Sequence, residues 1–163
     1  MAKLLFDEML KRTVKWCRIF GISSEFLEGR GDSALLEYAK NNNLIFITRD
    51  LELSLRCGKA GVKCVFLRSD SIEEQIAQIV MESGEAITFP GKTRCPQCNG
   101  ELEIVSVEKV KDSLPENVYL HHEKFWLCPG CGKIYWEGGH WKNITRINGS
   151  VKGIIECANQ KDI

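Results

Sequence analysis

The first ninety residues alternate between short apolar runs and segments with helical spacing. The apolar runs predict strands at residues 3–6, 22–27, 44–48 and 63–67. Between them, apolar residues at helical spacing predict helices from Met9 to Gly21 and at 33–41 and 51–59. Ser71 and Glu74 form a capping box that opens a further helix, to about Glu82. Strands that alternate with helices predict an α/β domain with a mainly parallel sheet.

The pattern changes near Phe89-Pro90-Gly91, which divides the chain into two predicted domains, 1–90 and 91–163. The second part holds short strand candidates at 102–107, 125–127 and 134–136, with a polar loop at 112–117. From about Gly139, apolar residues near helical spacing predict a terminal helix, interrupted near Asn148-Gly149.

Composition sets the class of protein. Apolar content is 44%, charged content is 27% and the formal net charge is zero, so a normal core is expected and no global basic field attracts nucleic acid. The N-terminus lacks the apolar region of a signal peptide, and no apolar run approaches the roughly 20 residues that cross a bilayer. We therefore expect a cytoplasmic protein without membrane contact.

Eight cysteines in such a chain suggest metal binding before disulfides. Four of them form two C-x-x-C pairs. The other four lie in apolar or helical contexts and are expected to be small core residues; they are Cys17, Cys57, Cys64 and Cys157.

The two pairs, Cys95-Pro-Gln-Cys98 and Cys128-Pro-Gly-Cys131, have the form of zinc knuckles. Two intervening residues let both sulfurs face one point, and Asn99 and Gly132 suit the positive φ that follows the second cysteine. Four thiolates around Zn²⁺ make a closed structural site. The alternative is a pair of disulfides or redox sites, which would not require the knuckle residues. The sequence therefore predicts a structural zinc ribbon with an extended loop between its knuckles.

Three aspartates stand where βα units place functional groups. Asp7 follows the first strand, Asp32 opens the second helix and Asp50 follows the strand at 44–48. Ligands of open parallel sheets bind outside the carboxyl ends of the strands. Aspartate is also a preferred helix cap, so each residue alone has a structural explanation. Glu8 and Glu52 add negative charge beyond what capping requires, and crowded carboxylates favour a bridging Mg²⁺ or Mn²⁺. Such ions can activate a water for phosphodiester cleavage.

Basic residues accompany these acids. Lys11, Arg12, Lys15 and Arg18 lie on the first helix, and Arg30 and Arg49 flank two of the aspartates. A solvated helix face explains the first four as well as phosphate contact does. We expect Lys11, Arg12 and Arg49 to bind substrate phosphate.

These residues together resemble the PIN-like Mut-seven C-terminal ribonuclease family. The resemblance is carried by Lys-Leu-Leu-Phe-Asp-Glu-Met-Leu at 3–10, by Trp-Cys-Arg-Ile-Phe-Gly at 16–21, by Asp-Ser-Ala-Leu-Leu at 32–36 and by Ile-Thr-Arg-Asp at 47–50. The knuckles and the Tyr-Trp-Glu-Gly-Gly-His-Trp segment at 135–141 are similar to that family's zinc-ribbon tail.

The resemblance implies a PIN-like three-layer α/β/α nuclease domain with an appended ribbon, and metal-dependent RNA hydrolysis. The family's acidic positions carry over to Asp7, Asp32 and Asp50, with Glu52 as the nearest match to a fourth acid and Glu8 as a second candidate. Trp136 and Trp141 could present a surface to RNA or to a protein, or pack against the ribbon and the terminal helix.

Three other functions fit the same residues. A non-catalytic RNA- or ribosome-binding module would keep the fold and lack divalent-ion affinity. A protein-interaction module would dock a partner through the ribbon. An aspartate-based phosphoryl enzyme would use Asp7 as nucleophile beside Lys63.

Overall fold

A four-stranded parallel sheet forms the centre of the computed structural model, which describes residues 3–162. Its strands are β1 (Leu4–Phe6), β2 (Ser24–Phe26), β3 (Ile45–Thr48) and β4 (Cys64–Phe66), in the order β2-β1-β3-β4. The predicted parallel sheet is confirmed, because each strand begins within two residues of its expected position and all three pairings are parallel.

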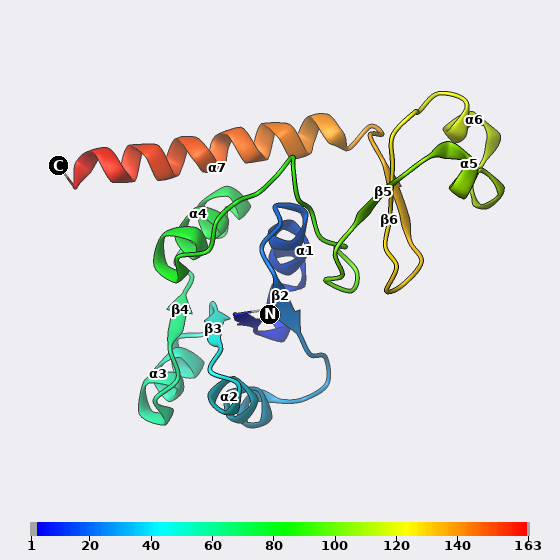
Figure 1. Cartoon of the computed structure of the whole chain (residues 1–163). Helices are drawn as coiled ribbons and strands as arrows, with labels where there is room; N and C mark the ends of the chain where they lie inside the picture. Colours follow the sequence, from blue (N-terminus) through cyan, green and yellow to red (C-terminus); the bar gives the residue numbers. More distant parts are fainter. Residues whose placement is uncertain (1–2, 163) are drawn as a thin grey trace.

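Helices cover both faces of this sheet. The helices α1 (Lys11–Ile19) and α4 (Ile72–Ser83) pack on one face, while α2 (Asp32–Asn41) and α3 (Leu51–Ala60) pack on the other (Figure 1). Side chains of a strand alternate between faces, so Leu4 and Phe6 join the first core and Leu5 joins the second. The predicted three-layer α/β/α architecture is confirmed.

A smaller antiparallel sheet follows, in the order β5 (Glu103–Val105), β6 (Phe125–Leu127) and β7 (Ile134–Trp136). The segment between β5 and β6 is not the predicted plain polar loop. It contains three short helical pieces, which are α5 (Val107–Val110), the 3-10 turn η2 (Lys111–Ser113) and α6 (Glu116–Tyr119). Buried Val110 packs with Phe125 in a small separate core, which gives this segment a reason to fold back on the sheet.

The terminal helix α7 (Trp141–Lys161) is continuous, so the predicted interruption near Asn148-Gly149 is wrong. Ile147 and Val151 are buried in the core that α1 and α4 form, and Figure 1 shows α7 crossing above α4. This packing outweighs the roughly 1 kcal/mol that a helical glycine costs. The predicted second domain includes α7, yet this helix contributes to the core of the first domain. The division at residue 90 therefore remains a prediction.

Two further predictions concern the cysteines and membranes. Cys17 and Cys57 are buried and Cys64 is half-buried. Cys157 is exposed on α7, so the expectation that it is a core residue is wrong. Within residues 3–162, every helix is too short or too polar to cross a bilayer.

Candidate metal centre and acidic site

The two C-x-x-C segments fold into knuckles with the same backbone pattern. In each, the first cysteine's N–H donates to the carbonyl five residues later, from Cys95 to Gly100 (2.8 Å) and from Cys128 to Lys133 (2.9 Å). Its carbonyl accepts from Asn99 or Gly132, the two residues with φ of 69° and 75°. The predicted positive φ is confirmed at both positions, and the turn points both sulfurs of a knuckle the same way.

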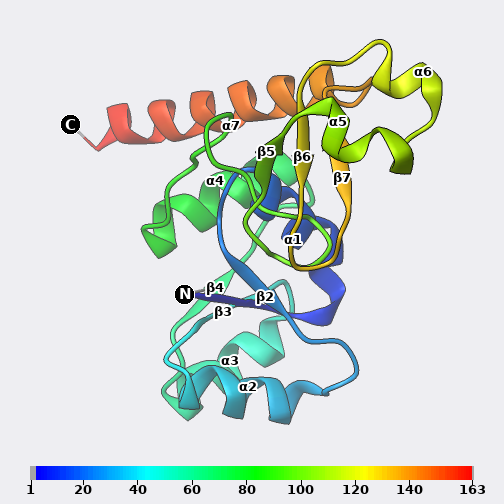
Figure 2. The same ribbon diagram turned by 45° about the vertical axis from the view of Figure 1, so that its right-hand side comes forward.

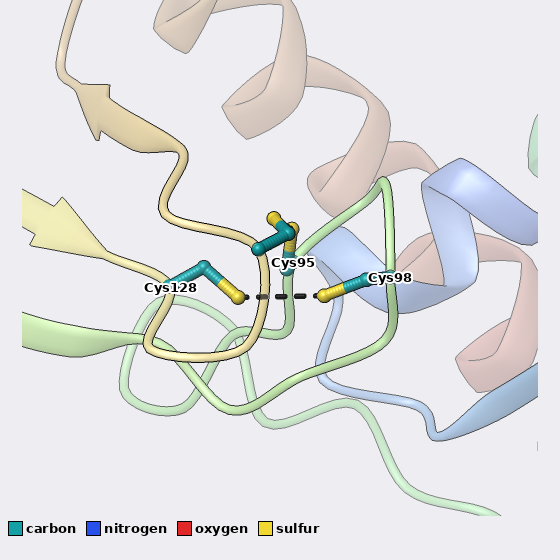
Figure 3. Close-up of side chains that lie close together, drawn as sticks. Cys95, Cys98 and Cys128 are labelled. Atoms are coloured by element: carbon teal, nitrogen blue, oxygen red, sulfur yellow. Dashed lines mark hydrogen bonds between the residues drawn. The ribbon is translucent and has the colours of Figure 1, made fainter.

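The four sulfurs of Cys95, Cys98, Cys128 and Cys131 lie within 4.8 Å of one another. The short contacts join different knuckles. Cys95 and Cys131 lie 3.6 Å apart at their sulfurs, and Figure 3 shows the second contact, of 3.4 Å, between Cys98 and Cys128. A tetrahedron of zinc thiolates with 2.3 Å bonds spaces its sulfurs about 3.8 Å apart, whereas a disulfide needs about 2.05 Å. The cluster therefore fits a four-coordinate metal and not the disulfide alternative.

Groups around the sulfurs support this assignment. The Tyr135 hydroxyl lies 3.1 Å from the Cys95 sulfur. Burial opposes ionisation of Cys95, but hydrogen bonds from Tyr135 and from the backbone of Cys98 outweigh it and lower the pKa of this thiol to about 7. A Cβ at Gly100 would lie 3.0 Å from the Cys128 sulfur, so the residue after the first knuckle has no room for a side chain. At Cys95 these contacts favour the thiolate, which is the form that binds metal.

Arg18 fastens the first knuckle to the α/β domain. Its guanidinium donates to the Ser24 carbonyl at 2.8 and 3.0 Å and to the carbonyls of Pro96 and Gln97 at 3.0 and 3.2 Å. Asn99 adds a second tie by accepting from the Ser24 N–H at 3.0 Å. Arg18 is only 6% exposed, so it belongs neither to a solvated helix face nor to a phosphate-binding surface, the two explanations that the sequence offered.

Replacing Arg18 should therefore separate the ribbon from the domain. We expect Arg18→Ala to lower the free energy of unfolding by about 2–4 kcal/mol, because four carbonyl hydrogen bonds of a buried charged group are lost. Arg18→Lys should recover only part of the lost free energy of unfolding, since an ammonium group cannot reproduce the planar arrangement of guanidinium N–H donors. Urea denaturation measures both. Lys15→Ala, an exposed position on the same helix, is the matched control. Equal stability of Arg18→Ala and this control would contradict the role of Arg18 in holding the first knuckle to the α/β domain.

The carboxyl ends of β1 and β3 form the switch point of the larger sheet. These strands are neighbours, yet α1 leaves β1 on one face and α3 leaves β3 on the other. Divergence of the two connections opens a crevice at this edge, the usual ligand site of such sheets. Asp7 and Asp50 follow the two strands and therefore lie at this edge of the sheet, but only Asp50 is among the residues that line the cavity described below.

Thr48, at the end of β3, links the two aspartates. Its hydroxyl donates to Asp7 Oδ2 at 2.8 Å and accepts from the Asp50 N–H at 3.0 Å. Asp50 Oδ1 caps α3 by accepting from the Leu53 N–H at 3.0 Å, while Asp7 Oδ1 has only a 3.5 Å contact with the Met9 N–H. The capping explanation therefore holds for Asp50 but accounts poorly for Asp7.

Asp7 is a buried carboxylate without a cationic partner among residues 3–162. It is 5% exposed, and in the described part of the chain it makes no salt bridge with a basic side chain. Burying a carboxylate is unfavourable unless a cation or several hydrogen bonds compensate. Oxygen donors of this kind suit Mg²⁺ or Mn²⁺, so the residues present fit a hard divalent ion.

A cavity of about 450 Å³ opens beside Asp50, between the start of α1 and the loop that follows β4. Two of the predicted phosphate-binding residues, Arg12 and Arg49, line it together with Asp70. Arg49 and Asp70 form an ion pair across the cavity. This loop is held in place because buried Gln75 accepts from Thr13 at 2.6 Å and donates to the Ser69 carbonyl at 2.8 Å.

The other predicted residues lie outside this cavity. Asp32 pairs with Arg56 at 3.6 Å on the opposite face, and Glu8 accepts from the Arg30 N–H at 3.1 Å. Glu52 is exposed on the first turn of α3, and Lys11 pairs with Glu28. Within residues 3–162 the cysteines form the one group of three or more ligands in reach of a common ion, so Asp7, Asp32 and Asp50 are not gathered into such a cluster.

Sequence reasoning missed Asp70 altogether and missed the structural role of Arg18. Asp70 follows the fourth strand, so the rule that singled out Asp7 and Asp50 would have found it, although three residues separate it from β4. Arg18 lies four residues after Val14 and next to Cys17, both buried, so the phase of the helix already placed it on the buried face.

Comparison with known proteins adds one family. Residues 2–148 match the model of the Mut7-C RNAse domain. Neither the curated proteins nor the solved structures contain a match to this chain.

Proposed function

This chain belongs to the Mut7-C RNAse domain family, and from that premise we propose that it is a divalent-metal-dependent ribonuclease whose acidic site lies at the switch point of the parallel sheet. The observation that carries the proposal is buried Asp7, which makes no salt bridge within residues 3–162 and is joined through Thr48 to Asp50. Zinc in the cysteine cluster is structural in this proposal, because four thiolates leave no coordination position for substrate.

Asp7 and Asp50 would hold Mg²⁺ or Mn²⁺. Such an ion supplies positive charge to the phosphodiester and makes water a better nucleophile. Thr48 keeps the Asp7 carboxylate in one orientation by donating to Oδ2, which leaves Oδ1 nearly free. A carboxylate that is already oriented in this way needs no further rearrangement, and so costs no reorganisation free energy, when the reaction occurs.

Arg12 and Arg49 would hold the substrate phosphate. Both line the cavity beside Asp50, and guanidinium groups bind phosphate in a bidentate manner. Arg49 forms a salt bridge with Asp70, but this ion pair is exposed to solvent and therefore weak. A phosphate entering the cavity can exchange with Asp70, which frees this carboxylate to approach the ion.

Asp32 remains a proposed third acid, with Glu52 and Glu8 as assisting candidates. The side chain of Asp32 is half exposed and its partner Arg56 is 3.6 Å away, so breaking this pair costs little. Among the described acids, Asp70 is better placed than Glu52 or Glu8 to serve as a fourth ligand, since it lines the same cavity as Asp50.

Cleavage of labelled single-stranded RNA by the zinc-loaded full chain, with and without added Mn²⁺, tests the proposal. We expect cleavage only with Mn²⁺ or Mg²⁺. We also expect Asp70→Asn to reduce the rate about 10-fold to 100-fold without lowering the melting temperature, because the Asp70 side chain is 88% exposed. Asp112→Asn, an exposed aspartate in η2, is the matched control. RNA binding without cleavage under any divalent ion would favour the non-catalytic RNA-binding alternative.

A further inference from the structure

A second cavity, of about 400 Å³, lies where the ribbon meets the α/β domain. Its walls come from the end of α1 at Ile19, from Phe89, from the strands β6 and β7, and from the start of α7 at Trp141. In Figure 2 the small sheet stands beside the upper part of α1, below the start of α7. Sites for small organic ligands have volumes of about 300–1,000 Å³, so the cavity has room for a flat heterocycle.

Aromatic rings form the walls of this cavity. Trp126 and Trp141 stack with centroids 5.5 Å apart and an interplanar angle of 19°, and Trp141 contacts Phe89 at 5.3 Å. Trp136 also lines the cavity, and like Trp141 it is only half-buried. Three of the chain's four tryptophans therefore line one cavity, and only Trp126 among them is buried. Aromatic walls of this kind bind nucleobases by stacking.

Basic side chains connect this cavity with the acidic site. A smaller hollow of about 170 Å³ beside α1 is lined by exposed Lys15 and by Lys11, which pairs with Glu28, and it shares Pro96 with the aromatic cavity. Arg12, on the same helix, lines the acidic cavity. The nine residues of α1 span about 14 Å, and this one helix contributes lining residues to all three hollows. At the aromatic cavity itself, Lys124 lies 5.0 Å above the ring of Trp126.

We propose that the aromatic cavity binds one base of a single-stranded RNA whose phosphates follow the basic side chains of α1 into the acidic site. This inference rests on the proposed ribonuclease function and adds a specificity subsite to it. RNA is favoured over a protein segment because Lys15 and Arg12, both exposed on α1, line the two other hollows along that helix, and one of these is the proposed site of cleavage. In this proposal the hydrogen bonds from Arg18 to the carbonyls of Pro96 and Gln97 fix the spacing between the base subsite and the acids.

Binding measurements without added Mg²⁺ or Mn²⁺ test this proposal on the intact zinc-loaded chain. The probes are a ten-residue oligoadenylate and an abasic ribose-phosphate oligomer of the same length, which carries the charge but no bases. We expect the oligoadenylate to bind at least about ten-fold more tightly and to quench the tryptophan fluorescence, while the abasic oligomer does neither.

A glycine in the cavity wall offers a position where a large side chain can be added at the cavity without a clash. A Cβ at Gly139 meets nothing within 4 Å, and Gly139→Leu should remove the ten-fold base preference while leaving abasic binding unchanged. Gly149→Leu makes the same change on the exposed side of α7, where a Cβ also meets nothing within 4 Å, and should behave as wild type.

A second pair of variants keeps the test independent of one substitution. Trp141→Ala should lose the base preference and Trp141→Phe should retain most of it, because phenylalanine keeps a face for stacking. Wild-type preference in either Gly139→Leu or Trp141→Ala overturns the proposal, as does equal affinity of wild type for the two oligomers, which would leave the cavity to a peptide or another occupant. Base-dependent binding without any cleavage would instead refute the ribonuclease function and leave the base subsite standing.

Discussion

Asparagine in place of Asp7 or Asp50 is expected to reduce divalent-dependent RNA cleavage by at least about 100-fold, because each substitution removes an anionic ligand of the proposed catalytic ion. The fold should survive both changes. Asparagine caps helices about as well as aspartate, so α3 keeps the hydrogen bond from the Leu53 N–H. At Asp7 the amide oxygen can still accept from Thr48, and a neutral side chain replaces a buried charge.

Stability and activity should therefore change in opposite directions at Asp7. We expect the melting temperature of Asp7→Asn to equal or exceed that of wild type, while the cleavage rate per folded molecule falls. Asp112→Asn again serves as the control for the substitution itself, since this aspartate is exposed and lies in the ribbon loop. Variants that unfold but keep wild-type activity per folded molecule would show that these aspartates are only structural caps.

Loss of the ribbon fold is the second large effect, and it should follow Cys128→Ser. Zinc-finger peptides gain about 10–16 kcal/mol from their metal, and the small core around Phe125 and Val110 cannot replace such a contribution. We expect one zinc per chain in wild type by elemental analysis and a large loss in Cys128→Ser. Cys157→Ser, an exposed cysteine outside the cluster, should bind zinc as wild type does.

Hydrogen exchange can locate the damage within the chain. Amides of β5, β6 and β7 should lose protection in Cys128→Ser, whereas those of β1 and β3 should keep it because their core is separate. The start of α7 should also loosen, since Trp141 stacks on Trp126 of β6. A ribbon that stays protected without zinc would contradict a metal-dependent fold.

Local patterns predicted most of this architecture. The run at 44–48 became β3 because β-branched and aromatic side chains suit a strand covered on both faces. Ser71 caps α4 through the Glu74 N–H, as its spacing from Glu74 indicated. The cysteine cluster was equally predictable, since the knuckle turns are local and depend on residues within six positions of each other.

Features that depend on contacts between distant segments were harder to predict. The continuity of α7 through Gly149 follows from burial of Ile147 and Val151 against a core that lies far away in the sequence. The pairing of Asp70 with Arg49 depends on β3 and β4 being neighbours, and the pairing of Asp32 with Arg56 depends on how α2 and α3 pack. Local spacing contains none of this information. Asp7, Asp32 and Asp50, which all stand at a strand end or a helix start, therefore lie in three different environments.

Anomalous diffraction from crystals soaked in Mn²⁺ tests the central claim most directly, because it locates the ion without reference to activity. The account predicts an anomalous peak between the carboxylates of Asp7 and Asp50, absent from crystals of the Asp7→Asn variant. Crystals that show no manganese there, with Asp7 bonded only to Thr48 and Met9 and Asp50 only capping α3, would contradict it.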